Sequence, residues 1–361
     1  MENLALEILN IFEENGYSAY IVGGYVRDKL LKINSKDIDI CTSATPKEIE
    51  TLFTTKTTDN YGSVKIIYKS NIFDITTYRK EIKYELNRKP VKIKYIKKIK
   101  KDLLRRDFTI NTLCINSEGI IEDKLNVMED LNNHIIKTVG NPRKRIKEDS
   151  LRILRAIRFS TILDFEIEQK TKYYLEKYGY LLKTLSYQRK KEELNKIFSS
   201  NNKEKGRELI LELKLEENLN IEKLESIELC DDILGIWAQL EVDDIYPFNK
   251  LEREQMKSIR ELLKLDLYSP YTLYKYDLYL TTVAASILKK NITKINKIYK
   301  ELPINSNKDI AITPMEIATI LNKKPGNYLK KIISDLEKEI LNKKLTNNKK
   351  KISDYILKNY K

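Results

Sequence analysis

Two aspartates separated by one residue are the first candidates for chemistry. Asp37 and Asp39 lie in KDIDIC, whose alternating pattern predicts a strand over residues 36–41. Alternate strand residues project from one face about 7 Å apart, so the two carboxylates would repel each other unless a cation lay between them. Magnesium, which prefers oxygen ligands, fits such a pair. The alternative is the exposed face of an amphipathic strand, with Ile38 and Ile40 buried.

A glycine pair upstream predicts an anion site. Gly23 and Gly24 stand between a strand predicted over residues 17–22 and a helix predicted over residues 25–31. Without Cβ atoms, they leave backbone N–H groups at the helix N-terminus open to a phosphate. The first turns of this helix also carry two charged residues, Arg27 and Asp28.

A third carboxylate lies in the segment FDITTYR. Asp74 sits on a strand predicted over residues 72–78, which makes it a candidate third catalytic residue from a neighbouring strand. An ordinary exposed strand residue is the alternative.

The rest of the composition narrows the chemistry. The single histidine, His134, excludes histidine-cluster metal sites, and three scattered cysteines exclude a disulfide framework or a zinc cluster. Ser-His or Cys-His catalysis would have only His134 as its base, so the chemistry must rest mainly on carboxylates, arginines and metal ions.

Charge and hydropathy indicate the class of protein. The net charge of +14 suits a polyanionic partner such as nucleic acid, although a generally lysine-rich composition explains it equally well. The N-terminus carries acids where a signal peptide would carry basic residues, and no apolar run approaches the roughly 18 residues of a membrane span. We expect a soluble, cytoplasmic protein without membrane contact.

These residues need an α+β scaffold to position them. Helices are predicted over residues 4–14 and 46–53, the second capped by Thr45, and further strands of the same small sheet over residues 64–68 and 91–95. Gly140, Asn141 and Pro142 mark a boundary. Beyond it the periodicity is helical, with helices expected over residues 145–163, 169–182, 188–198 and 203–213.

Linked motifs resemble a known family. The segments GGYVRD, DIDICTSATP, DITTYR, RRDFTIN, EDSLRILRAIRF and QRKKEEL, in this order, are similar to those of class II tRNA nucleotidyltransferases, which include CCA-adding enzymes and bacterial poly(A) polymerases. The later segment LPINSNKDIAITPMEIATIL resembles the tail of bacterial CCA-adding members. The resemblance implies a polymerase-beta-like head with a small mixed sheet, followed by an all-helical neck, body and tail, over residues 1–138, 139–200, 201–250 and 251–361.

The resemblance also implies roles for individual residues. It places two magnesium ions on Asp37 and Asp39. Triphosphate contacts fall on Gly23, Gly24, Arg27 and Asp28, and further nucleotide contacts on Arg106, Asp107 and Asn111 of RRDFTIN.

Base selection is expected in EDSLRILRAIR. Asp149 and Arg152 would be neighbours on one side of a helix, followed by two further nucleotide-binding candidates, Arg155 and Arg158. Cytosine and adenine present an amino donor beside a ring-nitrogen acceptor, which matches an acceptor-only Asp and a donor-only Arg and mismatches guanine and uracil. The family uses this pairing, and an ordinary surface ion pair is the alternative.

The change from C to A addition is attributed in the family to a loop that corresponds to residues 81–104 here. Arg88, Lys89 and Pro90 resemble its motif, whereas Leu86 replaces an expected aspartate. In QRKKEEL, Gln188 similarly replaces an expected glutamate, while Arg189 and Glu193 remain.

The expected reaction adds CCA to the 3′ end of tRNA from CTP and ATP, with release of pyrophosphate and catalysis by two metal ions. Lysine-rich tail helices would hold the tRNA through phosphates and shape. The alternatives are an A-adding enzyme or poly(A) polymerase of the same family, or a non-catalytic basic RNA-binding protein. The sequence favours a monomer without fixing the oligomeric state.

Overall fold

The computed structural model describes residues 1–59, 61–85 and 89–361, with backbone alone at 81–85 and 89–92. The chain forms two compact units, Met1–Glu225 and Ser226–Lys361, which we describe separately. The finer domain boundaries at 138, 200 and 250 stay predictions. Leu86 and Arg88 of the predicted loop motif lie outside the described residues. Within the described ranges, no helix is both long and apolar enough to cross a bilayer.

A seven-stranded mixed sheet forms the centre of the first unit. Its order is β3-β4-β5-β2-β1-β8-β9, and β2 runs parallel to β5 while the other neighbours are antiparallel. The strands are β1 Ala19–Val22, β2 Asp39–Thr42, β3 Thr54–Thr58, β4 Ser63–Tyr68, β5 Asn71–Thr77, β8 Cys114–Ile115 and β9 Ile121–Glu122. The expected mixed sheet is confirmed, with β3, β8 and β9 as strands that the sequence analysis did not predict.

Two smaller sheets flank the main one. One is an antiparallel pair of β6 Arg79–Glu85 and β7 Lys89–Tyr95. The other is a parallel pair of β10 Ile135–Ile136 and β11 Glu166–Ile167. The prediction that residues 91–95 join the main sheet is therefore wrong, because this strand pairs locally with β6. The region after residue 138 is helical except for β11, a small departure from the all-helical expectation.

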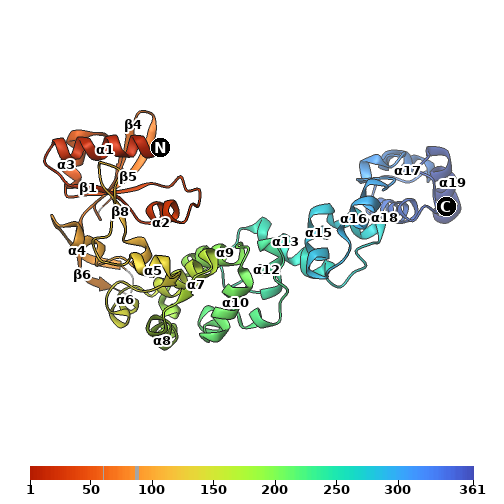
Figure 1. The fold of residues 1–361 in the computed structure, drawn as a ribbon. Helices are drawn as coiled ribbons and strands as arrows, with labels where there is room; N and C mark the ends of the chain where they lie inside the picture. The colour runs from red at the N-terminus through yellow and green to blue at the C-terminus, as the bar shows by residue number, and fades with distance from the viewer. Residues whose placement is uncertain (60, 86–88) are drawn as a thin grey trace. The chain divides into compact units, whose positions relative to one another are not determined.

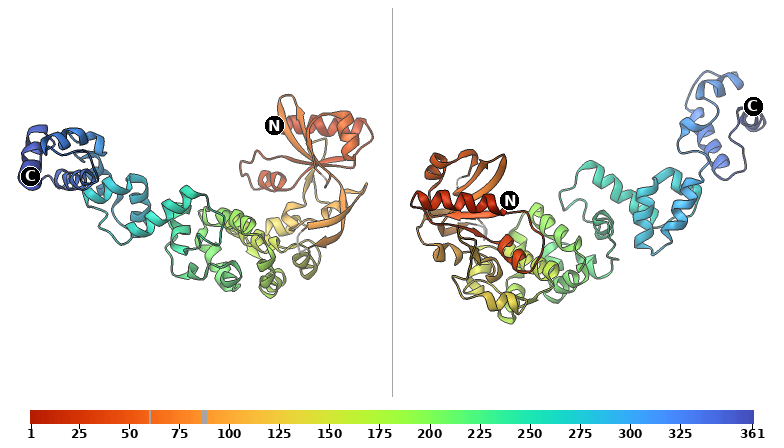
Figure 2. Two further views of the ribbon diagram at one scale, coloured as in Figure 1. Left: turned by 180° about the vertical axis from the view of Figure 1, so that it is seen from behind. Right: turned by 45° about the horizontal axis from the view of Figure 1, so that its top comes forward.

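Helices cover the main sheet and lead to its edge. They are α1 Glu2–Glu14, α2 Gly24–Leu30, α3 Pro46–Leu52, α4 Ile99–Leu103 and α5 Met128–Asn132, with the 3-10 turn η1 Thr109–Asn111. The inner face of α1 buries Ala5, Ile8, Leu9 and Phe12 at helical spacing. Thr45 and Glu48 form a capping box at α3, which confirms the predicted start of that helix. Figures 1 and 2 show α1 lying across the sheet beside α3.

The helical part of the first unit begins at Pro142. Its elements are α6 Pro142–Glu148, α7 Leu151–Leu163, α8 Gln169–Lys177, η2 Gly179–Thr184, α9 Tyr187–Phe198, α10 Lys203–Glu212, α11 Glu216–Leu219 and η3 Glu222–Glu225. The helix predicted over residues 145–163 is interrupted at Asp149, whose φ of −148° and ψ of 103° are extended. Asp149 and Arg152 therefore do not share one helix, and the break aims the Asp149 carboxylate separately from α7.

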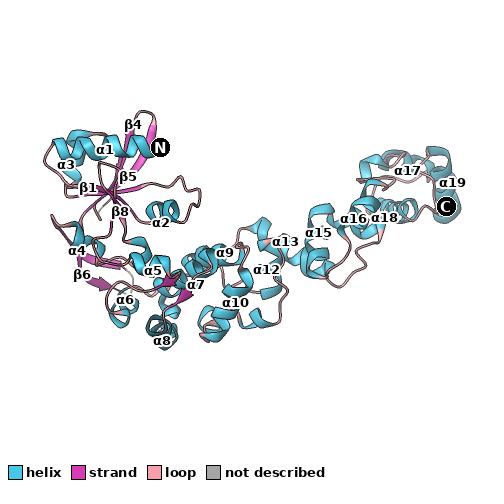
Figure 3. Ribbon diagram, in the orientation of Figure 1, coloured by secondary structure: helices cyan, strands magenta, loops and turns pink. Residues whose placement is uncertain are grey.

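The second unit contains helices joined by loops, as Figure 3 shows. They are α12 Ile233–Leu240, α13 Lys250–Leu262, α14 Pro270–Tyr276, α15 Leu278–Ile287, α16 Ile292–Lys300, η4 Asn307–Asp309, α17 Pro314–Ile320, α18 Tyr328–Leu341 and α19 Lys349–Tyr360. The last three helices gather around a core that includes Ile317, Leu336 and Ile352, all completely buried (Figure 2).

Candidate active site

A large cavity lies within the first unit, between the main sheet and α7. Its volume is about 1210 Å³. The walls come from the turn between β1 and α2, the start of β2, the residues around η1, the start of α7, and the segment from Thr184 to Arg189. Thirteen of the fourteen residues predicted to act in catalysis or nucleotide binding line it, and the exception is Asp74. A pocket of this size accommodates a nucleotide.

Arginine supplies the positive charge of this cavity. The chain contains 14 arginines among 67 basic residues, yet the described residues that line the cavity include eight arginines and no lysine. The arginines are Arg27, Arg79, Arg105, Arg106, Arg152, Arg155, Arg158 and Arg189. A lysine-rich composition does not explain this concentration. The planar guanidinium matches the fork geometry of phosphates and base edges, which indicates a site built for a nucleotide.

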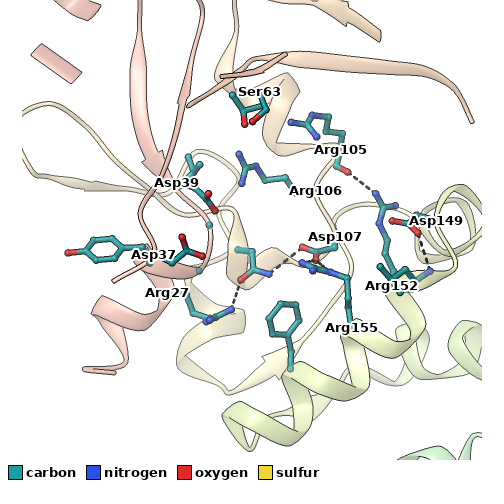
Figure 4. Close-up of a pocket in the computed structure, with 18 of the residues that line it drawn as sticks. Arg27, Asp37, Asp39, Ser63, Arg105, Arg106, Asp107, Asp149, Arg152 and Arg155 are labelled. Carbon is teal, nitrogen blue, oxygen red and sulfur yellow. Dashed lines mark hydrogen bonds and ion pairs between the residues drawn. The ribbon is translucent and has the colours of Figure 1, made fainter. Parts of the chain in front are cut away.

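Asp37 and Asp39 both face the cavity, although only Asp39 belongs to a strand. The predicted strand over residues 36–41 is wrong at its start, because β1 ends opposite Asp39 and turns away at Gly23, leaving Asp37 without a pairing partner. Figure 4 shows both carboxylates on the same side of the cavity. The surroundings of Asp39 desolvate it and Asp37 repels it, and both effects raise the pKa of the Asp39 carboxyl. A bound cation would relieve this repulsion.

Asp74 is next to Asp39 in the sheet but does not line the cavity. The parallel pairing of β2 with β5 places the two residues opposite each other in register, hence on the same face. The Asp74 carboxylate accepts a hydrogen bond from Lys65 Nζ at 2.7 Å. Its catalytic role stays a prediction.

The glycine pair fits its predicted place. Gly23 adopts a φ of +84°, a conformation that residues with a side chain rarely adopt, and it turns the chain from β1 into α2. A Cβ added to Gly23 would lie 3.6 Å from Asp39 Oδ2 and 3.7 Å from Arg106 Nη1. A side chain at this position would therefore point toward a carboxylate and a guanidinium of the cavity.

A buried carboxylate orients the arginines of RRDFTIN. Asp102, completely buried, pairs with Arg105 Nη2 at 2.8 Å and Arg106 Nη2 at 3.4 Å, and accepts the backbone N–H of Arg79 at 3.0 Å. Burial alone would raise its pKa, but the two guanidinium groups and the Arg79 N–H outweigh that effect and lower it. Arg106 lines the cavity, and its Nε is buried without a hydrogen-bond partner among the described residues.

A chain of hydrogen bonds runs from α2 through η1 to α7 (Figure 4). Arg27 pairs with Asp28 and donates to Asn111 Oδ1 at 2.7 Å, while Asn111 Nδ2 donates to Asp107 at 3.3 Å. Asp107 accepts Arg155 Nε at 2.7 Å. Burial would raise the pKa of Asp107, but Arg155 and the backbone N–H of Phe108 lower it well below its usual range. These five predicted nucleotide-binding residues thus form one connected wall.

Asp149 and Arg152 lie on the opposite side of the cavity from Asp37 and Asp39, as Figure 4 shows. Arg152 donates from Nη1 to the carbonyl of Arg145 at 2.7 Å and from Nη2 to the carbonyl of Arg105 at 3.0 Å, which fixes its guanidinium. The backbone N–H of Leu151 donates to Asp149 at 3.1 Å. Burial raises the pKa of Asp149, opposed by Arg152 and this N–H. Two side chains of opposite polarity are therefore held rigidly at one end of the cavity.

QRKKEEL supports this wall from α9. Glu193 accepts a hydrogen bond from Arg158 Nη1 at 2.9 Å, and both side chains are buried. Gln188 instead donates to Glu192 at 3.0 Å, and it does not line the cavity. The substitution at Gln188 therefore leaves the cavity wall itself unchanged.

Several cavity residues did not emerge from the sequence. Arg79 is the last residue of DITTYR and Phe159 is the last residue of EDSLRILRAIRF, so both belong to motifs of the family, although neither carried a predicted role. Asp59 and Tyr61 come from the turn before β4, Ser63 begins β4, and none of the three carries a recognisable signal. Their place depends on which turn the sheet brings to this edge.

Three family models match the chain. Residues 19–137 match a poly A polymerase head domain, residues 164–222 match a probable RNA and SrmB-binding site of polymerase A, and residues 250–356 match a putative tRNA nucleotidyltransferase domain 2.

Whole-chain relatives are similar over almost the entire sequence. A CCA-adding enzyme of Anoxybacillus flavithermus is 31% identical over 99% of this chain and 97% of its own length, and one of Ligilactobacillus salivarius is 32% identical over 96% and 93%. The crystal structure of the Bacillus stearothermophilus CCA-adding enzyme in complex with CTP has the same fold, with a TM-score of 0.86 at 24% identity over 99% of this chain and 96% of that one. This chain belongs to the class II CCA-adding enzyme family of tRNA nucleotidyltransferases.

Proposed function

We propose that this enzyme completes the 3′ end of tRNA by adding C, C and A from CTP and ATP, without a nucleic-acid template. The observation that carries the proposal is the single cavity that holds Asp37 and Asp39 on one side and the Asp149–Arg152 pair on the other. Its relatives are named for this activity, and structures of similar fold contain CTP, ATP or tRNA.

The residues at the catalytic side fit magnesium. They offer two carboxylates, and burial, together with the charge of Asp37, raises the pKa of the Asp39 carboxyl. The described residues contain no cluster of three or more metal-binding side chains. Magnesium commonly uses one or two carboxylates and completes its shell with water and substrate phosphates, so the donor set fits two ions held by Asp37 and Asp39. When bound, they supply Lewis acidity that favours the 3′-alkoxide and neutralises charge on the leaving phosphates.

The reaction joins the tRNA 3′ end to the nucleotide, and residues of the protein position the triphosphate for it. The 3′-hydroxyl oxygen of the tRNA forms a bond to the α-phosphorus, the α–β phosphoanhydride bond breaks, pyrophosphate leaves, and the hydroxyl proton passes to water. Gly23, Arg27 and Arg106 line the part of the cavity next to the aspartates, where they would hold the triphosphate in line for this displacement. No protein base is required.

Base choice would follow from the fixed Asp149–Arg152 pair. Arg152 uses two N–H groups on backbone carbonyls, and a guanidinium has five, so donors remain for a ring nitrogen. Asp149 would accept the exocyclic amino group of cytosine or adenine. Guanine and uracil would place a carbonyl against the carboxylate, which leaves a polar group unpaired.

The direct test uses tRNA transcripts that end before CCA, after C and after CC, each with CTP, ATP or both in the presence of Mg²⁺. We expect two Cs to be added to the transcript that ends before CCA, one C to the transcript that ends after C, and the final A only to ends that already carry CC. AMP addition to CC ends alone would identify an A-adding enzyme, long A tails a poly(A) polymerase, and binding without incorporation a non-catalytic RNA-binding protein. The protein should act as a monomer in the cytoplasm.

A further inference from the structure

Phe159 has three guanidinium groups around its ring. The Cζ atom of Arg158 lies 4.4 Å from the ring centroid, and those of Arg27 and Arg155 lie 5.2 Å from it. Arg27 comes from α2, whereas the other two share α7 with Phe159. One phenyl ring therefore contacts cations from two segments that are distant in the sequence.

These three cations repel one another. Each has its own partner, since Arg27 pairs with Asp28, Arg155 with Asp107 and Arg158 with Glu193. The partners do not remove the repulsion completely. Burial lowers the pKa of Arg158, and the charges of Arg155 and Arg27 lower it further. A residue at their common centre that attracts all three would counter this repulsion.

A phenyl ring provides such attraction and an aliphatic side chain of similar size does not. The faces of an aromatic ring carry partial negative charge, and a guanidinium within about 6 Å of the centroid is attracted to them. The ring is also fixed in place, because Phe108 packs edge-on against it with 5.7 Å between centroids and 80° between planes. Phe159 is 8% exposed and lines the cavity.

We infer that Phe159 is a positioning residue, whose ring holds Arg27, Arg155 and Arg158 at the cavity wall, where they donate to the incoming nucleoside triphosphate. The identity of that ligand rests on the proposed function. The ring acts on phosphate and ribose contacts rather than on base choice, because Asp149 and Arg152 lie outside this cluster. Its removal should therefore weaken CTP and ATP binding to the same degree.

Fluorination of the ring separates this electrostatic role from packing. Fluorine withdraws electron density from the ring face while the ring keeps its shape, so 4-fluoro- and 3,4,5-trifluorophenylalanine at position 159 should raise the Kd of Mg-CTP and Mg-ATP stepwise. We expect about a tenfold increase for the trifluoro variant and at least as much for Phe159→Leu. Phe159→Tyr should restore affinity to near the unmodified value.

The matched control is the same fluorinated series at Phe165. This buried ring stacks on His134 at 4.6 Å, and the described residues place no guanidinium against it. Fluorination there should leave both Kd values unchanged. Titration calorimetry on the full chain without tRNA measures all variants, with thermal unfolding as the check on folding.

The outcomes are distinct. Equal Kd values along the fluorinated series at position 159 overturn the inference, even if Phe159→Leu fails to fold. An unmodified protein that binds no nucleoside triphosphate overturns it as well. If the unmodified protein binds CTP but adds no nucleotide to tRNA, the proposed function fails, and the fluorinated series still decides the role of Phe159.

Discussion

Eight of the 14 arginines line the cavity of the first unit, whereas residues 261–361 contain 20 lysines and no arginine. The cavity arginines are fixed by carboxylates and carbonyls, as in the pairs Arg155–Asp107 and Arg158–Glu193. Many lysines of the second unit, such as Lys330 and Lys331 on α18, project into solvent. A fixed fork suits a small ligand whose atoms must be aligned, while a mobile ammonium suits a phosphate backbone bound by charge and shape.

The largest effect expected from this contrast is a variant that loses nucleotide incorporation but keeps its affinity for tRNA. Asp39→Asn should lower nucleotide incorporation by at least about a thousandfold, equivalent to roughly 4 kcal/mol of transition-state stabilisation, because it removes a proposed metal ligand. Gel-shift measurements should find tRNA affinity within about twofold of the unmodified protein. Asp74→Asn should cost less activity, since Asp74 does not line the cavity.

The exposed Asp354 on α19 provides a matched control in the second unit. Asp354→Asn should retain full incorporation. If Asp39→Asn kept near-normal incorporation, the assignment of the metal site would be wrong.

Exchanging arginine for lysine in the cavity, and lysine for arginine in the second unit, tests whether the geometry of the cationic group matters at each place. Arg155→Lys replaces two donors to Asp107 with one, and kcat/KM for CTP should fall about 10- to 100-fold because a hydrogen-bonded charge pair is weakened. Lys330→Arg with Lys331→Arg should leave tRNA affinity within about twofold. Steady-state kinetics and gel shifts measure both. If Arg155→Lys were tolerated as well as the two Lys→Arg changes, the contrast between fixed cavity arginines and mobile lysines of the second unit would be wrong.

Within the cavity, Asp149→Asn should change base choice more than rate. The amide carries both a donor and an acceptor, so it accommodates the carbonyl of uracil, and the ratio of kcat/KM for CTP over UTP should fall about tenfold. Asp28→Asn, at the other end of the cavity, should lower kcat/KM for CTP and kcat/KM for UTP together and leave their ratio unchanged. A constant ratio in Asp149→Asn would remove Asp149 from base recognition.

The smallest effects concern acid and salt. Asp107 and Glu316 both have lowered pKa values, the first through Arg155 and Phe108 N–H despite burial, the second to about 2 through Lys349 and Thr313. For both carboxyl groups the folded-state pKa lies below the unfolded-state value. Each ionised carboxylate therefore stabilises the folded protein above about pH 4.5. This contribution is lost as the pH falls toward the folded-state pKa.

Salt distinguishes the two carboxylates. Asp107→Asn should lower Tm by several degrees at both 0.1 M and 1 M NaCl, because its pair with Arg155 lies inside the cavity wall. Glu316→Gln should lower Tm only slightly, and 1 M NaCl should reduce the difference, because its pair with Lys349 is exposed to solvent. Calorimetry of the full chain at pH 7 and pH 4 measures both. Equal salt sensitivity would mean that Asp107 is not shielded from solvent.

Local features of the fold followed from local sequence. The capping box at Thr45, the apolar spacing in α1 and the turn at Gly23 each depend on a few adjacent residues, so their positions were predicted correctly. The start of β2 and the partner of β7 were predicted wrongly, because strand pairing depends on residues elsewhere in the chain. The break at Asp149 was missed because the helical periodicity continues through it.

The sequence by itself determined the chemical groups of the site and their order, since the paired aspartates, the glycine pair and the Asp149–Arg152 spacing are read from short motifs. Only the tertiary structure decided how they meet. The carbonyl of Arg105 that fixes Arg152, and the ring of Phe159 on α7 that contacts Arg27 of α2, join residues that are far apart in the chain. Such contacts depend on how the sheet and helices pack, which no short motif encodes.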